Sequence, residues 1–74
     1  MSNNEKRWAI WRRDDGSVVS WTEKVKVMNE NLDELKQMAQ DLFEDALLME
    51  VSEGQIREVL HSLVDRLENP YGKP

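Results

Sequence analysis

The sequence NLDELKQMAQDLFEDALLMEV, residues 31–51, decides the fold because its apolar residues recur at the spacing of an α-helix. At about 100° per residue they fill an arc roughly 180° wide, whereas a helix with one neighbour typically has an apolar stripe of about 100°. The apolar residues are Leu32, Leu35, Met38, Ala39, Leu42, Phe43, Ala46, Leu47 and Met49. We therefore expect a central helix that contacts two neighbours, one along Met38 and Leu42 and the other along Phe43 and Leu47.

A second helix is predicted after the first. Ser52 and Gln55 have the spacing of a capping box, in which two side chains bond the free N–H groups at the start of a helix. From Ile56 onward the apolar residues form a one-sided helical stripe that ends before Pro70, because the residue before a proline avoids the helical conformation. The sequence thus predicts an αα-hairpin of residues 32–50 and 54–68. The two ends, 1–5 and 70–74, are expected to be flexible.

The N-terminal region predicts a β-hairpin. The turn sequence Asp14-Asp15-Gly16-Ser17 separates two segments rich in aromatic and β-branched residues. Two registers fit this pattern. A two-residue turn pairs Ile10 with Trp21, and a three-residue turn has Gly16 as a bulge. In the second register one face contains Ala9, Trp11, Val19 and Trp21.

Residues 22–28 allow two interpretations. Val25 and Val27 alternate with lysines, as in an edge strand that charge protects from pairing, but the spacing of Ser20 and Glu23 also resembles a capping box. The weak helix propensity of valine favours the strand. The predicted fold class is therefore α+β, in which an antiparallel β-hairpin, extended by this third strand, packs on the C-terminal αα-hairpin.

Composition limits the classes of function. Seventy-four residues with 39% hydrophobic content predict one small domain, residues 1–74. The absence of cysteine excludes disulfides and thiolate zinc sites and suits the cytoplasm. His61 is the only histidine, so a nitrogen-rich metal site is excluded as well. No apolar run approaches the ~18 residues of a membrane span, so we expect no membrane association.

The net charge of −5 is unevenly spread. Residues 1–27 contain six basic and four acidic residues, whereas residues 28–74 contain four basic and eleven acidic ones. This acidic body disfavours nucleic acid as the main ligand, since phosphate affinity comes largely from Lys and Arg. Folding does not require like charges one helical turn apart, so we predict that the acidic face of the first helix docks a larger, basic protein. The predicted surface comprises Glu30, Glu34, Asp41, Glu44 and Asp45.

No residue is a candidate for catalysis, cofactor binding or metal binding. Acid–base chemistry needs groups whose pKa values are pushed apart, usually in a cleft, and these acids are expected on a solvated helix face. Glu58 and His61 have the spacing of di-iron bundle ligands, but they fall on the polar side of the second helix. We therefore predict a non-enzymatic interaction module that acts as a regulator, inhibitor or adaptor. The wide apolar arc also predicts a homodimer.

The alternative function is single-stranded nucleic-acid binding by the hairpin. Three tryptophans within fourteen residues are more than one hairpin face can hide, so one should be partly exposed. Tryptophan rings stack on bases, and neighbouring arginines contact phosphates. The residues that would act in this way are Trp8, Trp11, Arg12, Arg13 and Trp21.

Overall fold

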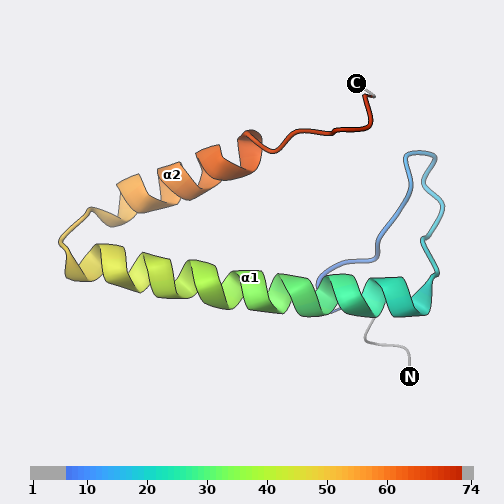
Figure 1. Cartoon of the computed structure of the whole chain (residues 1–74), viewed down its shortest axis with the longest axis horizontal. Coiled ribbons are helices and arrows are strands. Elements are labelled where there is room, and N and C mark those ends of the chain that lie inside the picture. The colour runs from blue at the N-terminus through green and yellow to red at the C-terminus, as the bar shows by residue number, and fades with distance from the viewer. Residues whose placement is uncertain (1–6, 73–74) are drawn as a thin grey trace. The chain divides into compact units, whose positions relative to one another are not determined.

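A computed structural model of the chain describes residues 7–72, and its regular secondary structure is entirely helical (Figure 1). Helix α1 spans Thr22–Leu48, helix α2 spans Glu53–Asp65, and the described residues contain no strand. The predicted α+β class is therefore wrong. Of the ends predicted to be flexible, residues 1–5 and 73–74 lie outside the described residues. The chain divides within α1 into two compact units, Met1–Ala39 and Gln40–Pro74.

Helix α1 begins well before the predicted start at Leu32, so the strand predicted over 22–28 is wrong. The backbone N–H of Val25 donates to the carbonyl oxygen of Trp21 at 2.9 Å, which is already the α-helical pattern. Val25 is only 2% exposed. Burying a valine side chain contributes about 1.5–3 kcal/mol, which exceeds the roughly 0.7 kcal/mol by which valine disfavours a helix. Tertiary burial therefore overrides the local preference for a strand.

Residues 7–21 contain the predicted turn, but the arms of this turn do not form strands. The N–H of Arg13 donates to the carbonyl of Ser17 at 2.8 Å, and the N–H of Gly16 donates to the carbonyl of Arg13 at 2.9 Å. Gly16 has a φ of 90°, so the turn is the three-residue form with a glycine bulge. Pairing continues through one isolated bridge, Arg12 to Val18. A two-stranded hairpin is marginal in water without a third strand or a packing partner, and residues 22–28 are helical here.

The connection between the helices is set by Glu50 and Ser52. Glu50 has a φ of 67°, and the N–H of Val51 donates to the carbonyl of Ala46 at 3.0 Å. Together they form a Schellman motif, which ends α1. Ser52 Oγ then accepts a hydrogen bond from the N–H of Gln55 at 3.1 Å and caps α2. Helix α2 therefore starts where the capping sequence predicts it.

The hydrophobic core is small. Among residues 7–72 the buried apolar residues are Val25 in the first unit and Ala46 and Ile56 in the second. Along α1, Phe43 is half-buried, but Met38 is 69% exposed and Leu42 is 48% exposed. The prediction that α1 contacts neighbours along both flanks is therefore wrong for the flank that contains Met38 and Leu42.

Candidate protein-interaction surface

The five acidic residues predicted to dock a partner all lie on α1 and are all exposed. In the first unit Glu30 and Glu34 lie one turn apart, and in the second unit Asp41 and Asp45 do so. Glu44 accepts a hydrogen bond from Gln40 Nε2 at 2.9 Å. The structure thus places two like-charged pairs at i,i+4 spacing, an arrangement that costs a helix a few tenths of a kcal/mol per pair.

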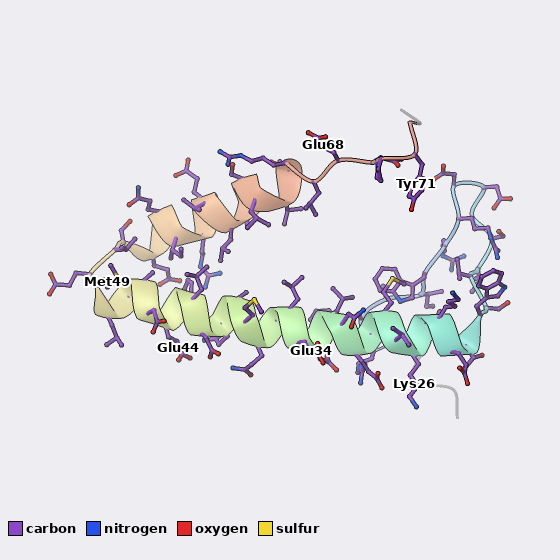
Figure 2. The ribbon with its side chains drawn as sticks, viewed as in Figure 1. Lys26, Glu34, Glu44, Met49, Glu68 and Tyr71 are labelled. Carbon is purple, nitrogen blue, oxygen red and sulfur yellow. The ribbon has the colours of Figure 1, made fainter. Side chains whose placement is uncertain are left out.

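The N-terminal part of this acidic surface is less negative than the sequence predicts. Because α1 starts at Thr22, Lys26 lies one turn before Glu30 on the same helix. Figure 2 shows Lys26 and Glu34 projecting from the same side of α1 within the first unit. The capping-box spacing of Ser20 and Glu23 is the sequence signal that could have predicted this earlier start.

The two units divide the charge of the chain sharply. Residues 1–39 contain seven basic and seven acidic residues, whereas residues 40–74 contain three basic and eight acidic ones, so the net charge of −5 belongs to the second unit. In that unit Arg57 Nε contacts Glu53 Oε2 at 2.9 Å, and its guanidinium lies 4.8 Å from the centre of the Phe43 ring. Arg57 is therefore engaged within its own unit, which leaves seven other acidic residues and two other basic residues in that unit.

The two arginines of the alternative site are bound to their own turn. Arg12 Nη1 donates to the carbonyl oxygen of Gly16 at 3.0 Å. Arg13 Nη1 donates to Ser17 Oγ at 3.2 Å and to the carbonyl oxygen of Val18 at 3.1 Å. Both guanidinium groups thus help to hold the turn, and a phosphate would have to compete with these hydrogen bonds.

The three tryptophans have different surroundings. Trp8 is 41% exposed and its Nε1 donates to Asp33 Oδ1 at 3.0 Å, while Trp11 is half-buried. Trp21 is 63% exposed, and Lys24 Nζ lies 5.9 Å from the centre of its ring, within the range of a cation–π contact. The prediction that at least one tryptophan is partly exposed is therefore confirmed, with Trp21 the most exposed of the three.

Asp33 is a structural residue that the sequence interpretation missed. One carboxylate oxygen accepts from Trp8, and the other lies 3.2 Å from Arg7 Nη2. These two contacts join the start of the described chain to α1 in the first unit. The sequence offered no signal for them, because the pairing depends on how residues 7–21 fold back over the helix.

A shallow groove also lies along the start of α1 in the first unit. It is lined by Glu23, Lys24, Val27, Met28 and Asn31. All five lining residues come from the same helix, so the groove is an open surface feature, and it shows no grouping of side chains typical of a catalytic centre.

Within residues 7–72, no group of three or more His, Cys, Asp or Glu side chains is placed to hold a metal ion. Neither α1 nor α2, the helices of this part of the chain, combines the length and the apolar character needed to cross a membrane. Comparisons with protein-family models, curated proteins and solved structures found no match. The function therefore has to be argued from the charge and burial of the chain itself.

Proposed function

We propose that this chain is a small, acidic, non-enzymatic interaction module that docks a larger basic protein and acts as its regulator, inhibitor or adaptor. The observation that carries the proposal is the concentration of the net charge in residues 40–74. Asp41, Glu44 and Asp45 are exposed on α1 in this unit. Complementary charge steers a basic partner toward such a surface and repels acidic competitors.

The energetics of α1 support a role in binding for these acids. Asp41 and Asp45 form a like-charge pair at i,i+4, which destabilises the helix slightly. A partner that places Lys or Arg beside this pair removes the repulsion, so binding recovers the free energy that folding gives up. The cysteine-free sequence suits the reducing cytoplasm, where we expect the module to act.

The test compares what co-purifies with the tagged protein and with a charge-reversed variant, followed by binding measurements with the purified partner. In the variant Glu34, Asp41 and Asp45 become lysine. We expect the helical signal in circular dichroism to persist and binding to fall by at least about tenfold, as for loss of an electrostatic contact of about 1.4 kcal/mol.

A matched control reverses Glu5, Asp14 and Glu50 instead, which changes the net charge by the same amount outside α1. This control should bind more tightly than the α1 variant if the position of the charge matters and not only its total. Unchanged binding by a folded α1 variant would rule the proposal out.

Single-stranded nucleic-acid binding is the competing hypothesis, and the exposed Trp21 ring with Lys24 beside it is the observation in its favour. The engagement of Arg12 and Arg13 in their own turn counts against it. A binding isotherm with single-stranded DNA at two salt concentrations separates the hypotheses. Tight binding that weakens steeply with salt would favour the nucleic-acid hypothesis.

A further inference from the structure

We infer that the N-terminal segment is a strap, that the carboxylate of Asp33 latches it to α1, and that this latch opens as the ionic strength rises. The strap is residues 7–21, and the latch is the pair of contacts that Arg7 and Trp8 make with Asp33. Both contacts lie within the first unit. The device therefore does not depend on the partner proposed above.

The latch closes a long loop of the chain. Figure 1 shows the strap leaving the start of α1, turning back and meeting α1 again farther along the helix. At this meeting point Trp8 Nε1 donates to Asp33 Oδ1 at 3.0 Å, and Arg7 Nη2 lies 3.2 Å from Asp33 Oδ2. Two consecutive residues of the strap thus hold the two oxygens of one carboxylate, so a single side chain of α1 receives both contacts.

The latch is accessible to water and dissolved ions. The side chains of Arg7 and Asp33 are 43% and 48% exposed. An ion pair this exposed contributes little net stability, because its side chains lose conformational freedom and salt screens their charges. The contacts must also offset the entropy lost on closing the loop, since Trp8 lies 25 residues before Asp33. A latch with so small a net stability should open within the otherwise folded protein.

The turn inside the strap has hydrogen bonds of its own. The N–H of Val19 donates to the carbonyl of Trp11 at 2.9 Å, and the N–H of Gly16 donates to the carbonyl of Arg13 at 2.9 Å. The side chains of Arg12 and Arg13 add bonds to acceptors in residues 16–18. All of these bonds join residues within 11–19, so opening the latch breaks none of them. The strap should therefore keep its turn when the latch opens.

The test follows hydrogen exchange of the Trp8 indole N–H by NMR in the full chain. From about 0.02 M to about 0.5 M sodium chloride the Debye length falls from roughly 20 Å to about 4 Å, and this exchange should become at least about threefold faster. The Trp21 indole N–H in the same sample corrects for the direct effect of salt on exchange. The amides of Gly16 and Val19 should change by less than about twofold, because their hydrogen bonds lie inside the turn.

Two variants identify the charges that matter. Asp33→Ala removes both contacts and should speed exchange of the Trp8 indole N–H at low salt by at least about threefold. Arg7→Gln removes the ion pair but keeps the carboxylate that accepts from Trp8, so exchange should become nearly independent of salt. Glu34→Ala is the matched control, because Glu34 is an exposed acid at the next position of α1. Its exchange should stay within about twofold of the unchanged protein.

The salt titration of the unchanged protein and the Arg7→Gln variant leave α1 unaltered, so the test does not depend on whether Asp33→Ala folds. Circular dichroism of each variant verifies that the helices persist. Exchange of the Trp8 indole N–H that ignores salt would overturn the inference, and so would equal rates in folded Asp33→Ala and Glu34→Ala. Loss of protection at Gly16 and Val19 together with Trp8 would overturn it as well, since the strap would then unfold and not move as a unit.

Discussion

Replacing Glu50 with glycine should stabilise the helix–turn–helix of residues 40–72, because Glu50 adopts a backbone conformation that favours glycine. Its φ of 67° lies in the left-handed region. Its N–H donates to the carbonyl of Leu47 at 2.9 Å, and the next N–H, that of Val51, donates to the carbonyl of Ala46 at 3.0 Å. This pair of hydrogen bonds requires a positive φ at position 50. Glycine therefore keeps the turn while removing its steric strain.

The expected gain in stability is the difference between two terms. An L-residue in the left-handed region costs about 1–2 kcal/mol relative to glycine. Glycine also gives the unfolded chain more conformational freedom, which lowers the free energy of unfolding by about 0.4–1 kcal/mol. The net stabilisation should be roughly 0.5–1 kcal/mol. For a domain of this size, that corresponds to a rise of about 2–8 °C in Tm.

Thermal melting followed by circular dichroism measures the effect, with Glu50→Ala as the control. Alanine removes the same negative charge but retains the Cβ that makes the left-handed conformation costly. Its Tm should stay within a few degrees of the unchanged protein, since surface substitutions usually change stability by less than about 0.5 kcal/mol. If the glycine variant melted at or below the alanine variant, the argument from backbone strain would be refuted.

Three further predictions concern the caps and turns. Gly54→Ala should stabilise α2 by about 0.4–1 kcal/mol, because an added Cβ would meet nothing within 4 Å; a lower Tm would contradict this. Ser52→Ala should lower stability by about 0.5–2 kcal/mol through loss of the cap on Gln55, whereas Ser52→Asp retains an acceptor and should lose much less. Two hydrogen bonds lower the pKa of Asp15: the larger effect comes from the Ser17 hydroxyl and the smaller from the Ser17 backbone N–H. These hydrogen bonds to ionised Asp15 should therefore stabilise the turn fully above the ordinary aspartate pKa of about 3.9. The stabilisation should be lost as the pH falls through the lower pKa that Asp15 has in the folded protein. In an NMR titration the Ser17 amide signal should report an apparent pKa below 3.9, and a higher one would disprove the contact.

The features that the sequence determined by itself are local ones. Gly16 marks a turn that needs a positive φ, and the structure has that turn. Ser52 and Gln55 predict the start of α2, and the predicted hydrogen bond forms between them. The uneven charge of the chain is likewise a property of the sequence. Each of these features depends on residues within a few positions of one another, so no distant contact is needed to produce it.

Tertiary structure decided which face of α1 is covered, and it decided between the strand and the helix that the sequence allowed for residues 22–28. The local preference of residues 22–28 for a strand is a fraction of a kcal/mol per residue, and the burial of Val25 outweighs it. The earlier start then places Lys26 beside the acidic surface. The periodicity of α1 shows that an apolar arc exists but cannot show what packs on it, because that depends on residues far away in the chain. Met38 and Leu42 therefore remain exposed although their pattern is that of a core.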